Sequence, residues 1–304
     1  MKLASVQSKG STYVAVVDST QQKAWPLLDV FPDLPRSAGV DMVQAITHLS
    51  GADFSFVSRG PGAALASLEV VAPLANPPRN IMCVGKNYHA HAREFAKSGF
   101  DTSAGAAGEA VPDHPIIFTK PATSISGPSS DIPMWPGLDE AIDYEAELAV
   151  VIGGGGRFIR REDAMSHVFG YTVINDVTAR DLQARHKQWF LGKSIDGFCP
   201  MGPWIVTADE IDGQNLKLTC RVNGELRQDA TTADLIFDIP TLIEVISRSV
   251  ELLPGDVIAT GTPEGVGIGF QPPRFLREGD VVECEISGIG LLRNTLRRKQ
   301  SETA

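Results

Sequence analysis

The chain has few of the residues that bind zinc, form disulfide frameworks or contact nucleic acid. It contains four cysteines in 304 residues, and none of them forms a C-x-x-C pair. Lys and Arg number 27 against 37 Asp and Glu, which gives a net charge of −10. Phosphate contacts need clustered basic residues, so this balance argues against a nucleic-acid partner. We therefore expect reduced, largely buried thiols and no nucleic-acid function.

Long apolar runs are also missing. No uncharged apolar stretch approaches the roughly 20 residues that a membrane helix needs, and the first residues lack the continuous apolar core of a signal peptide. The glycine-rich segment 261–267 is not followed by the Lys-Ser/Thr of a nucleotide-binding loop. We expect a cytoplasmic protein that binds neither a membrane nor a nucleotide phosphate.

The chain divides by composition into two parts. Residues 1–72 contain one strand-like run at 13–17 and one helix-like run at 41–49. Residues 73–78 contain three prolines, which is typical of a stiff linker. We expect a small N-terminal domain over 1–72 and a larger domain over 79–304.

The larger part is rich in short β-branched runs separated by Gly and Pro, which predicts a mainly β architecture. The predicted strands are Ile116–Thr119, Leu148–Ile152, Gly170–Ile174, Trp204–Thr207, Leu216–Val222, Val257–Thr260 and Val281–Ile286. One packing helix is predicted over Thr241–Leu252, where the apolar residues fall on one stripe after Pro240.

Three carboxylates suggest a metal site. In a strand, Glu145 and Glu147 project from the same side. With Asp176 they would form an all-carboxylate site, which suits Mg²⁺, Mn²⁺ or Ca²⁺ better than zinc. Two alternatives stay open: a half-solvated edge strand with acidic residues facing water, and a helix cap for Asp176.

His91 and Glu94 are candidates for acid–base chemistry. They stand three residues apart, so in a helix the carboxylate can orient the imidazole as a general base. A solvated helix face also carries such pairs, and His89 is the nearest rival for the role. His186 fits a surface or structural position better than a pocket.

Six blocks of sequence, in order, resemble the fumarylacetoacetate hydrolase family, in the branch of acylpyruvate hydrolases and related decarboxylases and isomerases. They lie between Ile81 and Asn294: Cys83-Val84-Gly85-Lys86-Asn87-Tyr88 with His91 and Glu94; Phe118-Thr119-Lys120-Pro121; Asp143-Tyr144-Glu145-Ala146-Glu147-Leu148; Gly170 to Gln183; Gly192 to Phe198; and Thr260 to Gly267. The resemblance implies an α+β, mainly β fold with a central mixed sheet rolled into a partly open barrel, a small N-terminal domain and a homodimer.

The resemblance also implies roles for individual residues. Glu145, Glu147 and Asp176 would bind the metal, Mg²⁺ or Mn²⁺ with Ca²⁺ as a further option. His91 and Glu94 would activate water, and Lys193 would contact the substrate or hold the metal ligands. Substrate contacts are implied for Arg180, Gln183 and Thr262, although Arg180 paired with a structural carboxylate and a plain tight turn around Thr262 are alternatives.

The implied function is hydrolysis of the C–C bond of a 2,4-dioxo acid of the acylpyruvate type, through a metal-bound enolate. The substrate would be a small anionic 2-oxo acid. The alternative is an oxaloacetate-type decarboxylase or a 2-hydroxy-dienedioate isomerase that uses the same site, and a third hypothesis is a metal-dependent binding module without catalysis. The Gly/Ala/Ser-rich segment Phe95–Asp113 is interpreted as a lid.

Overall fold

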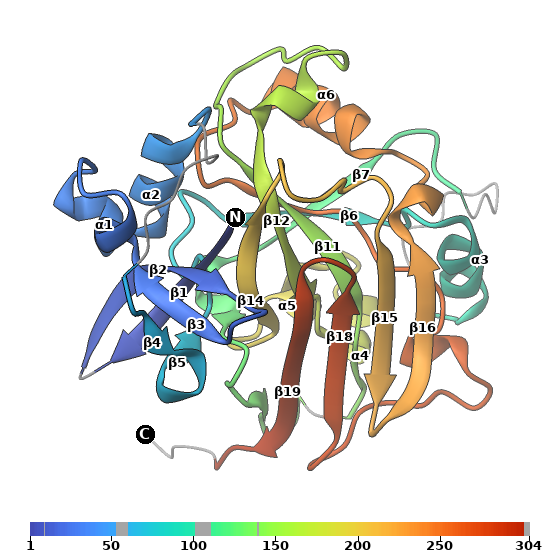
Figure 1. Cartoon of the computed structure of the whole chain (residues 1–304). Helices are drawn as coiled ribbons and strands as arrows, with labels where there is room; N and C mark the ends of the chain where they lie inside the picture. The colour runs from blue at the N-terminus through green and yellow to red at the C-terminus, as the bar shows by residue number, and fades with distance from the viewer. Residues whose placement is uncertain (9, 53–59, 101–110, 139, 301–304) are drawn as a thin grey trace.

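A large open sheet forms the centre of the computed structural model (Figure 1). The structure describes residues 1–8, 10–52, 60–100, 111–138 and 140–300. Ten strands follow one another in the order β4-β3-β2-β1-β14-β12-β11-β17-β6-β7, while β5 pairs with β1 and β8 with β14. The strands of this sheet are β1 (Lys2–Ser8), β2 (Ser11–Asp18), β3 (Lys23–Pro26), β4 (Ala63–Ala64), β5 (Glu69–Val71), β6 (Ile81–Gly85), β7 (Ile116–Lys120), β8 (Ile125–Ser126), β11 (Ala146–Ile152), β12 (Val168–Asn175), β14 (Cys199–Thr207) and β17 (Val257–Ala259).

A second sheet stands against the first, with the order β16-β15-β18-β19-β9. Its strands are β9 (Ile132–Met134), β15 (Lys217–Val222), β16 (Glu225–Thr231), β18 (Val281–Ile286) and β19 (Gly290–Arg298). A two-stranded ribbon joins β10 (Ile142–Asp143) to β13 (Thr178–Ala179). Apolar side chains of β11, β15 and β18 share one core cluster, so the two sheets pack face to face.

The described residues form six α-helices, which lie around the sheets (Figure 1). They are α1 (Leu27–Val30), α2 (Met42–Leu49), α3 (His89–Lys97), α4 (Arg180–Arg185), α5 (Phe190–Lys193) and α6 (Ile239–Ser249). No helix among the described residues is both long and apolar enough to cross a membrane.

The prediction of a mainly β fold with a mixed sheet is confirmed. All seven predicted strands are found, with ends that differ by up to a few residues. Among the described residues, the sheet path runs from β4 to β7 without closing into a barrel. The predicted helix at 241–252 begins earlier and ends earlier, because Asp238 caps its first turn and Val250 is already extended.

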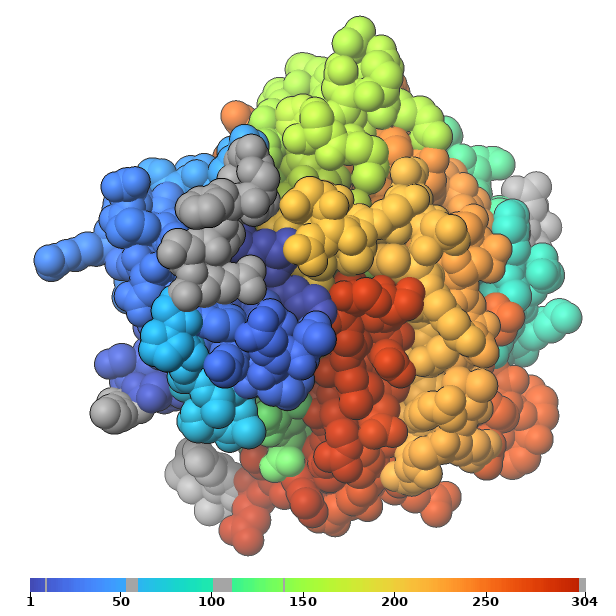
Figure 2. All heavy atoms as spheres, viewed as in Figure 1, coloured from blue at the N-terminus to red at the C-terminus, as the bar shows by residue number. Residues whose placement is uncertain are grey.

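The N-terminal residues share the large sheet with the rest of the chain. In β1, Lys2 and Leu3 pair with Val206 and Ile205 of β14. In Figure 2 the N-terminal and C-terminal residues meet along one face of the molecule. A separate small domain over 1–72 is therefore not confirmed, and the boundary near residue 72 stays a prediction.

Candidate metal-binding active site

Two neighbouring strands bring the three predicted metal ligands together. In the β11–β12 pair, Glu147 stands opposite Ile174, and the Asp176 amide donates to the Glu145 carbonyl at 2.8 Å. One carboxylate oxygen from each of Glu145, Glu147 and Asp176 lies within 4.8 Å of the others, and all three residues are buried. A single cation can therefore contact all three.

Both alternatives for these carboxylates are wrong. β11 lies between β12 and β17 in the interior of the sheet, so the acidic residues do not face water on an edge. Asp176 caps no helix, because α4 begins at Arg180 after the β13 strand.

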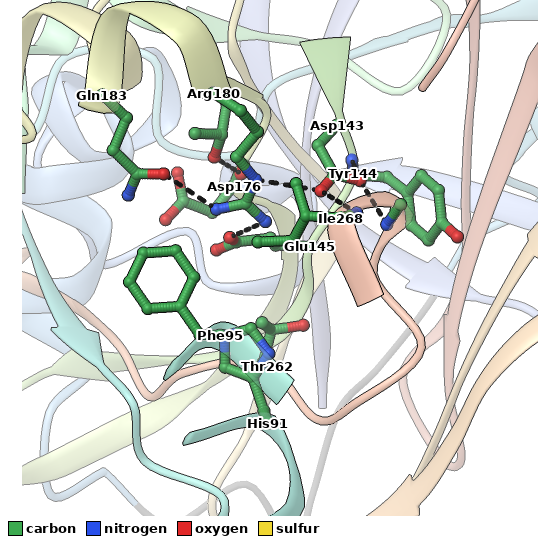
Figure 3. A network of polar contacts seen from close by, with 12 residues as sticks. His91, Phe95, Asp143, Tyr144, Glu145, Asp176, Arg180, Gln183, Thr262 and Ile268 are labelled. Atoms are coloured by element: carbon green, nitrogen blue, oxygen red, sulfur yellow. Dashed lines mark hydrogen bonds and ion pairs between the residues drawn. The ribbon is translucent and has the colours of Figure 1, made fainter. Parts of the chain in front are cut away.

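Buried cations pair with the carboxylates, and Figure 3 shows one of them, Arg180, between Asp143 and Glu145. Lys193 Nζ lies 2.7 Å from both Glu145 Oε2 and Asp176 Oδ2. Lys120 Nζ lies 2.8 Å from Asp176 Oδ1. The Arg180 guanidinium lies between Asp143, at 2.9 Å, and Glu145, at 2.6 Å. Arg180 thus pairs with a structural carboxylate, as the alternative had it, and it also faces the site.

The charges act differently on Glu145 and Glu147. Burial raises the pKa of Glu145, but Lys193 and Arg180 outweigh burial and hold the pKa at about 2. Burial and the negative charges of Asp176 and Glu145 raise the pKa of Glu147 well above its ordinary value. Among the described residues, no Lys or Arg forms an ion pair with Glu147, whose Oε2 accepts from the Gly261 amide at 2.9 Å. The site therefore has a place for further positive charge beside Glu147, and its oxygen ligands fit a hard divalent ion.

His91 and Glu94 lie on α3, as predicted from their spacing. His91 Nδ1 is 3.2 Å from Glu94 Oε2, and the His91 side chain is buried beside Phe95. Because a carboxylate can only accept, Nδ1 is assigned as the donor, which leaves the Nε2 lone pair available. His89, the rival, is exposed on the same helix.

The glycine-rich segment 261–268 holds carboxylates of the protein itself. The amides of Gly261 and Gly265 donate to Glu147 and Glu94, and those of Gly267 and Ile268 donate to Asp143. Gly265 has a φ of +94°, and a Cβ there would collide with the Arg227 carbonyl. These four amides are therefore engaged within the protein.

One pocket collects most of the predicted site residues. Its lining includes His91, Glu145, Glu147, Arg180, Gln183, Lys193 and Thr262. The Thr262 hydroxyl donates to the Ala146 carbonyl at 3.0 Å and accepts from Gln228 at 2.8 Å. Arg180 Nη1 donates to Gln183 Oε1 at 3.1 Å, which orients both side chains one turn apart on α4.

Other lining residues were not singled out from the sequence: Lys86, Phe95, Phe118 and Trp189. Lys86 and Phe118 lie in the sequence blocks that resemble the family. Their position in those blocks is the signal by which they could have been identified as pocket residues. The aromatic ring of Trp189 packs edge-on against Phe95 and Phe118, a contact that no local pattern predicts. Most of the predicted lid, residues 101–110, lies outside the described residues, and Phe95–Lys97 are helical.

The chain is similar to known proteins over most of its length. The sequence profile described as the fumarylacetoacetate (FAA) hydrolase C-terminal family matches residues 80–297. Oxaloacetate tautomerase YisK of Bacillus subtilis (strain 168) is 48% identical over 233 residues, 76% of this chain and 74% of the relative. A fumarylacetoacetate hydrolase from Exiguobacterium antarcticum superimposes with a TM-score of 0.81 at 39% identity, over 98% of this chain and 100% of the other. A 5-carboxymethyl-2-hydroxymuconate delta-isomerase from Mycobacterium smegmatis gives 0.74 at 34% identity, over 99% and 100%.

Proposed function

This chain belongs to the fumarylacetoacetate hydrolase C-terminal family, and from that premise we propose that it is an enzyme that interconverts the enol and keto forms of a small 2-oxo acid, with oxaloacetate as the expected substrate. The observation that carries the proposal is that His91, paired with Glu94 through Nδ1, lines one pocket with Glu145 and Glu147 of the carboxylate triad. The name of the relative at 48% identity, an oxaloacetate tautomerase, supports the same reaction.

Glu145, Glu147 and Asp176 would hold the divalent ion, with Mg²⁺ or Mn²⁺ as the first candidates and Ca²⁺ as a further one. When bound, such an ion polarises the 2-oxo group and makes a neighbouring C–H more acidic. Lys193 keeps Glu145 and Asp176 in place and offsets their charge. Arg180 and Gln183 face the pocket as contacts for the acid.

His91 would carry the proton. Its Nε2 takes a proton from C3 of the keto acid, while the 2-oxygen gains a proton, so the reaction is an isomerisation with no other reactant. Glu94 accepts from Nδ1 and thereby holds the ring in one tautomer and orientation.

A C–C hydrolase is the second candidate. It was the main expectation from the sequence, and the relative named fumarylacetoacetate hydrolase supports it. The relative with the higher identity is an oxaloacetate tautomerase, which favours proton transfer, as does the isomerase among the solved structures. Hydrolysis is therefore less well supported than the alternative expected from the sequence, which is a decarboxylase or a dienedioate isomerase at the same site.

The test follows enol-oxaloacetate by its ultraviolet absorbance in the presence of Mg²⁺. We expect the protein to accelerate its conversion to the keto form, and His91→Ala to lower the rate by about 10²–10⁴-fold. His89→Ala is the matched control, since it removes an exposed histidine two residues away. A parallel panel of acetylpyruvate, fumarylpyruvate and a 2-hydroxy-dienedioate is followed by NMR. Rapid release of pyruvate from acylpyruvates without faster enol–keto conversion would replace the proposal by the hydrolase.

A further inference from the structure

Trp189 lines the pocket, yet the proposed mechanism gives it no role. It is 8% exposed and shares the pocket with His91 and Glu145. We propose that the Trp189 indole sets the size limit for the carbon chain of the 2-oxo acid, so that Trp189 is a specificity-determining residue. This inference rests on the proposed function and deepens it, because it names the property of the acid that the site selects.

Trp189 lies one helical turn from a cation of the metal site. It immediately precedes α5, and the Lys193 amide donates to the Trp189 carbonyl at 3.1 Å. One turn of helix rises about 5.4 Å, and the side chains at both ends of this turn line the pocket. Lys193 Nζ in turn lies 2.7 Å from Glu145 Oε2. A group added on this side to an acid held beside Glu145 would therefore meet the indole.

The indole is held on three sides. Its ring packs edge-on against Phe95, with centroids 5.9 Å apart, and against Phe118, with centroids 5.2 Å apart. It also lies against Gly85, where a Cβ would stand 2.4 Å from Trp189 Cζ3. Packing of this kind resembles that of a protein core, so the ring cannot move aside without a loss of contacts.

The aromatic part of the pocket adjoins its polar part. The Phe118 centroid is 5.1 Å from Lys193 Nζ, and the Phe95 centroid is 5.8 Å from Arg180 Cζ. The polar part faces the carboxylate and the 2-oxo group, which every 2-oxo acid has. The aromatic part is therefore where the site can distinguish acids by the size of the rest of the chain, and Trp189 is the largest of its side chains.

Oxamate and its N-substituted derivatives test this inference without turnover. They share the carboxylate and the carbonyl of a 2-oxo acid and differ in the size of the group beyond the carbonyl. Titrated calorimetrically into the Mg²⁺-loaded wild-type protein, oxamate should bind at least about 10-fold more tightly than N-benzyloxamate. We expect Trp189→Ala to raise the affinity for N-benzyloxamate by about 10- to 200-fold, the range for apolar groups that a pocket admits or excludes, and to leave oxamate binding unchanged.

Three further variants check the contact itself. Phe190→Ala removes an exposed aromatic side chain from the next position, in α5, and should change neither affinity. Gly85→Ala pushes a methyl group against the indole and should weaken the binding of both ligands. Combination of Gly85→Ala with Trp189→Leu should restore oxamate binding, because the collision is with the indole. Trp189→Leu alone serves if the alanine variant does not fold, which circular dichroism would show.

Several outcomes would overturn the inference. Equal affinity of wild type for the two ligands, or the same preference in wild type and Trp189→Ala, would mean that Trp189 sets no size limit. A loss of oxamate affinity in Trp189→Ala would mean that the indole binds the acid itself. If neither protein bound any oxamate, the inference and the proposed function would both be wrong. The expected gain for N-benzyloxamate in a protein that converts no oxaloacetate would refute the proposed function alone.

Discussion

Glu145 and Glu147 stand two residues apart, yet their surroundings act on them in opposite directions. Lys193 and Arg180 keep the pKa of Glu145 at about 2 in spite of its burial. Glu147 receives one backbone hydrogen bond and faces two negative neighbours, so its pKa is raised well above the ordinary value. A divalent ion would remove this asymmetry, because it brings positive charge to Glu147, with which no Lys or Arg of the described residues forms an ion pair.

Removal of the Glu147 carboxylate should abolish most of the stabilisation of the protein by Mg²⁺. We expect millimolar Mg²⁺ to raise the Tm of the wild-type protein and EDTA to reverse the rise, since a ligand at about 100 times its Kd adds about 2.7 kcal/mol. Glu147→Gln should lose most of the Mg²⁺-dependent rise and most of the activity. The exposed Glu162→Gln is the control, because it removes the same charge on the surface. A full Mg²⁺ response in Glu147→Gln, measured by differential scanning calorimetry, would contradict the metal assignment.

The sequence predicted the three carboxylates of the triad. It predicted only some of the buried charges that pair around them. Period-two alternation predicted that Glu145 and Glu147 project from one side of a strand, which in the structure begins at Ala146, and the resemblance added Asp176. Lys120 comes from a different strand and Asp143 from the short ribbon before β11, so their contacts depend on strand order. Strand order is set by packing across the whole chain, which no local spacing records.

At the scale of elements, the segment 261–268 connects β11 to α3, because its amides donate to Glu147 and Glu94. The Tyr144 hydroxyl donates to the Gly265 carbonyl at 2.8 Å, and the Gly265 amide donates to Glu94 Oε1 at 3.0 Å. A Cβ at Gly269 would collide with the same Glu94 carboxylate. The orientation of the His91–Glu94 pair therefore depends on a loop that Tyr144 holds from the other side.

Loss of the Tyr144 hydroxyl should reduce turnover without loss of metal binding. One buried hydrogen bond contributes about 1 kcal/mol, so Tyr144→Phe should lower kcat by about 5-fold and leave Mg²⁺ affinity unchanged. Tyr171→Phe is the matched control, since Tyr171 is also buried and is bonded to the backbone of Gly213, away from the pocket. Equal losses of kcat in the two variants would show that general stability, and not the loop, is responsible.

A carboxylate at the N-terminus of α6, Asp238, predicts that the free energy of unfolding depends on pH. A hydrogen bond from Arg161, aided by Thr241, lowers the pKa of Asp238 to about 2 against an opposing effect of burial. Because the folded pKa lies below the unfolded value of 3.8, the stabilisation is present above pH 4 and is lost as pH falls toward 2. Asp238→Asn keeps a capping side chain but not the charge. We expect it to unfold at a lower urea concentration than wild type at pH 6, with the difference shrinking between pH 4 and pH 3; a constant difference would exclude the carboxylate as its source.

At the scale of the molecule, one core spans the predicted domain boundary. A single apolar cluster includes Leu3, Ile46 and Trp25 from the N-terminal part, and Ile81 and Phe169 from the rest. The proline-rich segment 73–78, which its composition predicts to be a linker, contains no helix or strand. It could not reveal that β1 pairs with β14, because a strand partner 200 residues away leaves no mark in local composition.

This shared core predicts that both parts of the chain unfold together. Leu3→Ala removes a fully buried side chain from β1 and should lower the free energy of unfolding by about 2–5 kcal/mol. Thermal loss of the catalytic activity and of the near-ultraviolet circular dichroism should then shift together to lower temperature, although Leu3 lies in no part of the pocket. Leu226→Ala, at a partly exposed position on β16, should shift neither signal appreciably. If activity persisted to the wild-type temperature while the N-terminal part of Leu3→Ala unfolded earlier, residues 1–72 would be an independent domain, and the shared core would contribute little to the stability of the site.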